Sequence, residues 1–165
     1  SDREDAYALE RARRAKVPLV LHVAPKAFAG REDFDRHLVG ILREARIDLV
    51  VLAGFMRILS PLFVREFRDR ILNIHPALLP AFKGGHAVKD ALEYGVKFTG
   101  VTVHFVDEEV DHGAIILQEP VAVRPKDTPE TLAARIHKVE HRLYPRAVDL
   151  FARGKLRVSG RLVKF

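Results

Sequence analysis

Apolar residues in the first half of the chain recur with the period of a helix in some segments and form continuous runs in others. The segment 34–45 places Phe34, Leu38 and Ile41 on one helical face. Continuous apolar runs such as 48–55 are typical of buried strands. The elements predicted in this half are helices over 6–16, 34–45 and 60–69, and strands over 17–23, 48–55 and 71–74. Alternation of this kind predicts an α/β protein with an open, mostly parallel, Rossmann-like sheet and helices on both faces.

The second half continues the pattern and adds a long helix. Its predicted elements are a helix over 86–94, strands over 98–106 and 114–123, a helix over 129–151 and a hairpin turning at Ser159 and Gly160. Only a short loop joins the strands predicted over 98–106 and 114–123, so we expect these strands to be antiparallel. Pro145 is predicted to kink or split the long helix. Because no repeat or linker is visible, we expect a single domain over 1–165.

Composition narrows the function classes. Of 165 residues, 48% are hydrophobic and 30% charged, which is ordinary for a globular protein, and no window has the apolar length of a membrane span. The absence of cysteine excludes thiol nucleophiles, disulfides and thiolate metal sites. No signal peptide is visible, which favours the cytoplasm. The formal charge is +6 with dispersed basic residues, so we expect anionic small molecules, and neither nucleic acid nor membrane, as partners.

Three polar side chains stand where predicted strands end. Asn73 and His75 close one strand in NIHPALLP, and Asp111 lies in the EEVDHG loop after another. Ligands of open α/β sheets bind outside the carboxyl ends of strands, so these groups are expected to converge. An amide and an imidazolium can stabilise an oxyanion, while a carboxylate raises the histidine pKa and orients the ring. Each residue also fits an ordinary role, in a turn or as a bonded loop residue.

The three groups indicate acyl transfer without a covalent enzyme intermediate, and two other chemistries are alternatives to it. A metal site could draw on His75, His86, His104 and His112 together with Asp111, but no pair has the spacing of an HExxH motif. A serine hydrolase is disfavoured because the sequence has no GxSxG turn. We therefore expect no metal.

Four segments carry a resemblance to a known family. They are VVLAGFMRILS (50–60), ILNIHPALLPAFKGGHA (71–87), GVTVHFVDEEVDHGAII (100–116) and KVEHRLYP (138–145). Together they resemble the phosphoribosylglycinamide formyltransferases, folate-dependent enzymes of purine synthesis. The resemblance runs over essentially the whole chain. Its most specific element is the ordered set of NIHP, the F-x-G-x-H of 82–86 and the D-x-G of 111–113.

The resemblance implies an activity and a set of roles. A formyl group would pass from the co-substrate 10-formyltetrahydrofolate to the amine of glycinamide ribonucleotide, without a metal. Asn73, His75 and Asp111 match the family's catalytic residues: Asn73 and protonated His75 would hold the developing oxyanion, and Asp111 would keep His75 charged and help move protons. The enzyme is expected to be a monomer or a homodimer.

Binding residues follow from the same resemblance. Positions matching folate contacts are Arg31, Met56, Arg57, Ile58, Leu59, Asn73, Asp107, Glu108, Glu109, Val110 and Asp111. Positions near the ribonucleotide are Gly84, His86 and Glu140. Ordinary roles stay open for several of them: Met56 and Leu59 as core residues, Arg31 as a surface residue at a helix start, and Glu140 on a solvated helix face.

The sequence also departs from the family pattern. The family's N-terminal strand and its Gly-Ser-Asn phosphate loop have no counterpart here, so we expect the recorded chain to be N-terminally incomplete. Ala114 stands where relatives usually have proline, and His112 where a small residue is common. Both flank Asp111 closely and could loosen the loop.

Related functions remain as alternatives. Formyltetrahydrofolate deformylase resembles the same core and uses water in place of the amine, but it carries a further regulatory domain and lacks the G-x-H of 84–86. A non-catalytic folate-binding module would have no need of Asn73, His75 and Asp111 together. Methionyl-tRNA formyltransferase is disfavoured because its additional C-terminal domain has no counterpart here.

Overall fold

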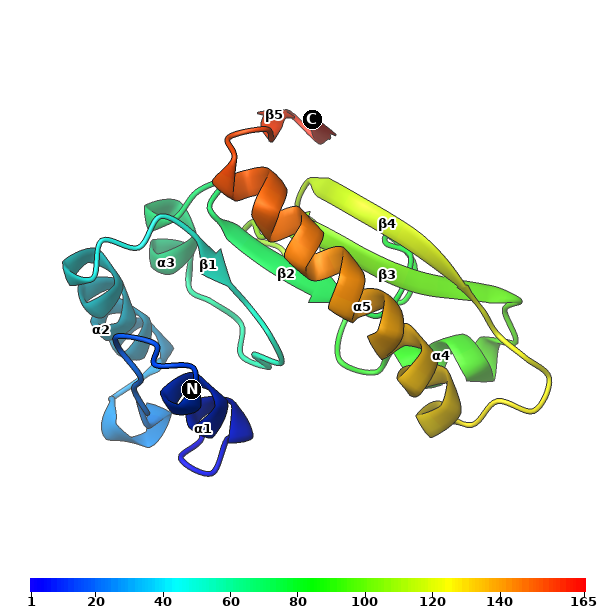
Figure 1. Ribbon diagram of the computed structural model, residues 1–165, viewed down its shortest axis with the longest axis horizontal. Coiled ribbons are helices and arrows are strands. Elements are labelled where there is room, and N and C mark those ends of the chain that lie inside the picture. Colours follow the sequence, from blue (N-terminus) through cyan, green and yellow to red (C-terminus); the bar gives the residue numbers. More distant parts are fainter. The chain divides into compact units, whose positions relative to one another are not determined.

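The computed structural model describes residues 1–165 as two compact units, 1–46 and 47–165 (Figure 1). The single-domain organisation expected from the sequence stays a prediction.

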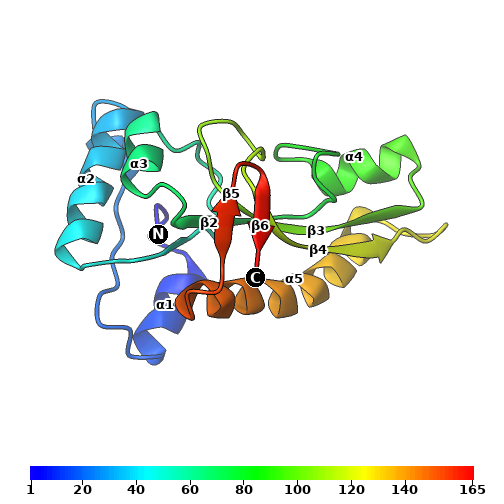
Figure 2. The same ribbon diagram turned by 90° about the horizontal axis from the view of Figure 1, so that it is seen from above.

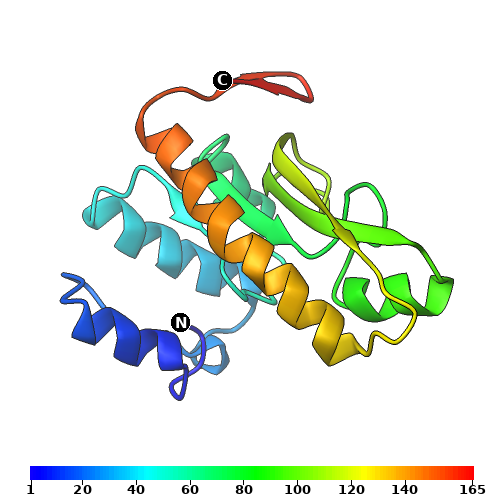
Figure 3. The same cartoon turned by 45° about the vertical axis from the view of Figure 1, so that its right-hand side comes forward.

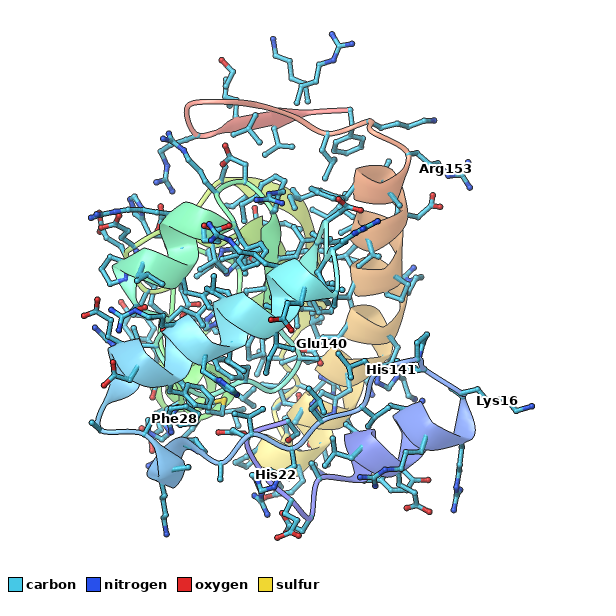
Figure 4. The ribbon with its side chains drawn as sticks, turned by 90° about the vertical axis from the view of Figure 1, so that its left-hand side faces the viewer. Lys16, His22, Phe28, Glu140, His141 and Arg153 are labelled. Carbon is cyan, nitrogen blue, oxygen red and sulfur yellow. The ribbon has the colours of Figure 1, made fainter.

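The first unit is helical. It contains α1 (Tyr7–Arg14), the short 3-10 helix η1 (Pro25–Ala27) and α2 (Arg31–Glu44). Phe34 of α2 is buried, and the ring of Phe28, labelled in Figure 4, meets it edge-on at 5.6 Å between centroids. Packing between aromatic rings therefore anchors α2 within this unit.

The strand predicted over 17–23 is wrong. This segment has no strand pairing, and its main-chain bonds to Ser1 are limited to those made by the Leu21 carbonyl and the Val23 amide. Val17 and Leu19 are exposed. An apolar run becomes a strand only where a neighbouring backbone satisfies its amide and carbonyl groups, and here too little backbone lies alongside.

The second unit contains a four-stranded sheet. Its strands are β1 (Val50–Val51), β2 (Ile71–His75), β3 (Phe98–Phe105) and β4 (Ile115–Ala122), in that spatial order. β1 runs parallel to β2, whereas β2–β3 and β3–β4 are antiparallel. The predicted α/β class and the predicted antiparallel pair are confirmed. β1 is much shorter than the run 48–55 indicated.

Three helices accompany the sheet: α3 (Pro61–Glu66), α4 (Ala87–Tyr94) and α5 (Pro129–Ala152). α5 crosses one face of the sheet (Figure 1) and buries Leu132 and Ile136 against a core that includes Leu72 and Val101. Burial of each such side chain contributes about 1.5–3 kcal/mol. Pro145 does not split α5, which stays continuous.

The chain ends in a small hairpin of β5 (Arg157–Ser159) and β6 (Leu162–Lys164) (Figure 3). The predicted hairpin is confirmed, although its two-residue turn is Gly160–Arg161, one position later than expected. Gly160 adopts φ +59°, a conformation that glycine reaches without strain. No helix in the structure combines the length and the apolar character that crossing a bilayer requires.

Candidate active site

The pairing of β2 with β3 gathers polar side chains on one face of the sheet. Asn73 lies opposite His104, and His75 lies opposite Thr102. Because side chains two positions apart, and directly opposed across strands, share a face, all four project together. The residues between these pairs, Ile74 and Val103, point to the other face, where they pack in the core that includes residues of α5. The helix and the polar cluster therefore occupy opposite faces of the sheet.

Asp111 reaches this cluster from the loop between β3 and β4. Its Oδ2 accepts a hydrogen bond from the Gly84 amide at 2.8 Å and lies 3.3 Å from Nδ1 of His75. Its Oδ1 lies 3.5 Å from Nδ2 of Asn73. The structure therefore brings together the amide, the imidazole and the carboxylate singled out in the sequence.

Local backbone geometry places Asp111. The residue itself has φ +48°, and a Cβ added at Gly113 would lie 1.9 Å from the carbonyl oxygen of Phe105. Only glycine permits this close approach of the loop to the end of β3. The glycine of the D-x-G element is thus required by packing two residues from the carboxylate.

His75 is buried, with 4% of its surface exposed, and both ring nitrogens face oxygen atoms. Nε2 donates to the carbonyl of Phe82 at 2.7 Å, and Nδ1 faces Asp111. Since Nε2 already holds a proton, Nδ1 can donate to Asp111 only when the ring is charged. Charging His75 and forming its hydrogen bond to Asp111 are therefore one event.

Asp111 raises the pKa of His75 as expected, but the net pKa of His75 lies below the ordinary histidine value. Burial lowers the pKa of His75, and this effect outweighs the charge of Asp111 and the Phe82 carbonyl, which both raise it. The resting imidazole consequently accepts a proton less readily than an ordinary histidine.

The opposite balance holds at Asp111. Burial alone would raise its pKa, but His104, the Gly84 amide and the charge of His75 together lower the pKa below its ordinary value. The carboxylate is therefore ionised at neutral pH.

His104 is a member of this cluster that the sequence reasoning considered only as a metal ligand. It is 2% exposed; Nε2 lies 3.2 Å from Nδ2 of Asn73 and 3.7 Å from Oδ1 of Asp111. Nδ1 donates to the carbonyl of Phe105 at 2.7 Å, which leaves Nε2 to accept from the Asn73 amide. His104 is the only titratable residue of β3, and this was the available signal.

Thr102 holds the segment that follows His75. Its hydroxyl donates to the Ala77 carbonyl at 2.7 Å and accepts from the Leu79 amide at 3.1 Å and from Gln118 at 2.9 Å. Gln118 also donates to the Leu79 carbonyl at 2.9 Å. This network fixes the turn that leads from His75 to Phe82.

The predicted folate residues fall into two groups. In the segment after β1, Met56 is 77% and Ile58 is 58% exposed, whereas Leu59 is buried. An ideal Cβ at Gly85 would lie 3.8 Å from Cε of Met56, so this segment reaches the turn that carries Gly84. Arg57 lies between Met56 and Ile58 in the same segment.

The second group lies in the loop that contains Asp111. Asp107 caps the turn by accepting from the Glu109 amide at 3.0 Å, and Glu108 accepts from Arg65 of α3 at 2.9 Å. Val110 is 49% exposed. Apolar and acidic groups thus lie together in the loop that carries Asp111.

The remaining residues predicted to bind the ligands lie outside these two segments. Arg31 is the first residue of α2, in the other unit. His86 is the exposed N-cap of α4, and Gly84 has φ +92°. Glu140, labelled on α5 in Figure 4, is largely buried, and burial raises its pKa despite the nearby His137 and His141. No group of three or more histidine or acidic side chains has the arrangement of a metal site.

A sheet face that presents an amide, an imidazole and an ionised carboxylate side by side defines an α/β protein equipped for chemistry at a carbonyl group. Comparison with known families identifies the class more closely. The model of the formyl transferase family matches residues 1–148. The chain belongs to the formyl transferase family.

The individual relatives of the chain are consistent with this family. Over 158 residues the chain is 45% identical to the phosphoribosylglycinamide formyltransferase of Escherichia coli, covering 96% of this chain and 74% of that protein. It is 48% identical over 159 residues to the trifunctional purine biosynthetic protein adenosine-3 of Drosophila melanogaster, covering 96% of this chain but 12% of that protein. The chain therefore spans only a small part of the trifunctional relatives.

A solved structure shares the fold. The crystal structure of glycinamide ribonucleotide transformylase 1 from Symbiobacterium toebii superposes with a TM-score of 0.97 at 53% identity, covering 100% of this chain and 77% of that one.

Proposed function

We propose that this chain transfers a formyl group from 10-formyltetrahydrofolate to the amine of glycinamide ribonucleotide, as a step of purine synthesis. The observation that carries the proposal is the juxtaposition of Asn73, His75 and Asp111 on one sheet face of a formyl transferase. Its relatives named phosphoribosylglycinamide formyltransferase and glycinamide ribonucleotide transformylase supply the substrate class.

The reaction needs one bond made, one bond broken and one proton moved. The substrate amine attacks the formyl carbon, and a tetrahedral adduct with a negatively charged oxygen forms. The bond from that carbon to the folate nitrogen then breaks, and a proton passes from the attacking amine to the departing nitrogen.

Asn73 is proposed as a donor to the oxyanion. Its contact with Asp111 is 3.5 Å, longer than its 3.2 Å contact with His104, so the hydrogen directed at Asp111 is the one most readily turned toward a substrate oxygen. A donor of this kind contributes about 3 kcal/mol to lowering the barrier.

His75 and Asp111 are proposed to act as one proton-holding unit. As the adduct forms, the amine proton passes through Asp111 to Nδ1 of His75, the ring nitrogen that carries no hydrogen at rest, and Nδ1 then donates to the ionised Asp111. The proton returns by the same route to the departing folate nitrogen. For His75 to meet substrate through Nε2, the substrate must displace the Phe82 carbonyl. Hydrogen bonds of an unliganded site commonly rearrange in this way when the substrate binds.

Binding roles follow from the positions of the other residues. Exposed Met56 and Ile58 are proposed to cover the folate ring, together with Leu59, Arg57 and the loop residues Asp107, Glu108, Glu109 and Val110. Gly84, His86 and Glu140 are proposed to meet the ribonucleotide, and Arg31 the folate. The proposed enzyme uses no metal, is cytoplasmic and works as a monomer or a homodimer.

The test is the release of tetrahydrofolate from 10-formyltetrahydrofolate, measured with and without glycinamide ribonucleotide. The proposal predicts release that depends on the ribonucleotide. Release of equal rate without it would identify a hydrolytic deformylase instead. No release, with the co-substrate still bound, would identify a folate-binding module.

A further inference from the structure

The C-terminal hairpin contacts the loop of residues 107–113, which carries Asp111. Figure 2 and Figure 3 show the turn of β5–β6 beside the connection from β3 to β4. From that turn, Nη2 of Arg161 donates to the His112 carbonyl at 2.7 Å. Nη1 lies 2.8 Å from Nε2 and 3.4 Å from Nδ1 of the same residue, so the guanidinium also contacts the imidazole ring. One side chain therefore holds both the backbone and the ring of His112.

The contact extends across the 107–113 loop. Nδ1 of His112 lies 2.7 Å from Oδ2 of Asp107, and the other oxygen of Asp107 accepts from the Glu109 amide at 3.0 Å. The chain of contacts from Arg161 through His112 to Asp107 thus joins the two ends of the loop. This bridge exists because position 112 is a histidine; a small side chain there could not span the loop.

The hairpin is itself fixed to the sheet. β6 packs against β4, and Leu156 and Val163 lie against the main hydrophobic core. The chain turns from α5 into the hairpin through Gly154, at φ +64°. Arg161 therefore projects from a supported element, and its contacts restrain the loop instead of following its motion.

Two other contacts also hold the loop of residues 107–113, each at a different residue. Asp111 is held by the Gly84 amide at 2.8 Å, and Glu108 is held by Arg65 at 2.9 Å. Neither contact involves the stretch from Glu109 to Val110 or the backbone of His112. Loss of Arg161 should therefore release those parts of the loop while leaving Asp111 near His75.

We propose that the C-terminal hairpin is a positioning element of the active site, in which Arg161, acting through His112, holds the 107–113 loop in the conformation that binds the folate co-substrate. This inference rests on the proposed function for the identity of the ligand. Arg161 is a positioning residue and does not itself contact the reacting atoms.

The test compares Arg161→Met with Arg157→Met. Methionine keeps the apolar stem and removes the charge, and Arg157 is an exposed arginine of the same hairpin whose side chain makes no hydrogen bond or ion pair. Arg161→Met should raise the dissociation constant and the KM for 10-formyltetrahydrofolate about three- to tenfold, the range expected for one or two exposed hydrogen bonds. The KM for the ribonucleotide and kcat should stay within about twofold. Equal constants in the two variants would overturn the proposal.

A double-mutant cycle tests whether His112 is the link. His112→Ala should weaken co-substrate binding to a similar degree, and the double variant should be no weaker than either single one, because both changes break the same chain of contacts. Effects that simply multiply would show that Arg161 does not act through His112.

Amide hydrogen exchange gives a readout that needs no activity. Exchange within 107–113 should be faster in Arg161→Met than in Arg157→Met, with equal protection in β2 and β3. If exchange differs as predicted while the native protein transfers no formyl group, the proposed function fails and the restraint of the loop stands. If exchange is identical in the two variants, the inference itself fails.

Discussion

Two parts of the candidate site differ in whether their side chains already have partners within the protein. In the buried cluster, Asn73, His75 and Asp111 all have protein partners within 3.5 Å. In the segment after β1, Met56 and Ile58 expose 77% and 58% of their surface. Buried polar groups without partners are costly, so the cluster is bonded before any ligand arrives, whereas exposed apolar side chains gain stability only when a ligand covers them. The groups proposed for catalysis are therefore preorganised, whereas the side chains proposed for binding become covered only by the ligand.

Removing the carboxylate should break the preorganised part most severely. Asp111→Asn keeps the size of the side chain but cannot stabilise a charged His75, so kcat should fall about a hundredfold or more with little change in KM. Steady-state transfer kinetics measure this. Asp149→Asn, which alters an exposed ion pair with Arg153, should keep native kinetics. Equal rates in the two variants would place the chemistry elsewhere.

Truncating an exposed apolar side chain of the segment after β1 should change KM and leave kcat unchanged. Met56→Ala removes apolar surface that a bound folate would cover, so the KM for 10-formyltetrahydrofolate should rise about fivefold, with kcat unchanged. Phe98→Ala, which truncates a side chain 62% exposed at the start of β3, is the matched control. A fall in kcat at constant KM would show that Met56 serves the chemistry and not the binding.

The supporting network can be tested through stability. Thr102→Val leaves the Leu79 amide without its partner, so the free energy of unfolding should fall by about 1–3 kcal/mol. Thr99 on the same strand is equally buried, but its hydroxyl has no hydrogen-bond partner. Thr99→Val should therefore leave stability unchanged or improve it. Denaturant unfolding measures both, and an equal loss in the two variants would contradict the role given to Thr102.

The smallest expected effect concerns pH. Because burial lowers the pKa of His75 in the folded state, its contribution to stability is fully present above the ordinary histidine pKa of about 6.5 and is lost as the pH falls through the lowered value. Between pH 7 and pH 5 the native protein should therefore lose more stability than His75→Asn, whose side chain cannot be charged. An equal loss in both would show that His75 has no lowered pKa.

The sequence predicted the parts of the site that lie at strand ends. Asn73 and His75 close an apolar strand and Asp111 lies in the loop after another, which made them candidates, and the resemblance to the formyltransferase family gave them their roles. His104 was not placed in the cluster, because its contact with Asn73 depends on the register of β2 against β3. The Phe82 carbonyl carries no sequence signal at all.

Contacts between distant parts of the chain, which the sequence does not reveal, also explain the errors in the predicted fold. The run 17–23 has the composition of a strand, but pairing decides strand formation, and pairing is not a local property. The net pKa of His75 depends on burial by residues far along the chain, which the presence of Asp111 alone did not reveal.

The most direct test of the central claim follows an isotopically labelled formyl group of 10-formyltetrahydrofolate by NMR in the presence of glycinamide ribonucleotide. Direct transfer at the Asn73–His75–Asp111 cluster predicts that the label appears as a formamide on the ribonucleotide nitrogen, and that Asp111→Asn nearly abolishes this signal. Label that appears as free formate, or transfer that Asp111→Asn leaves intact, would contradict the account.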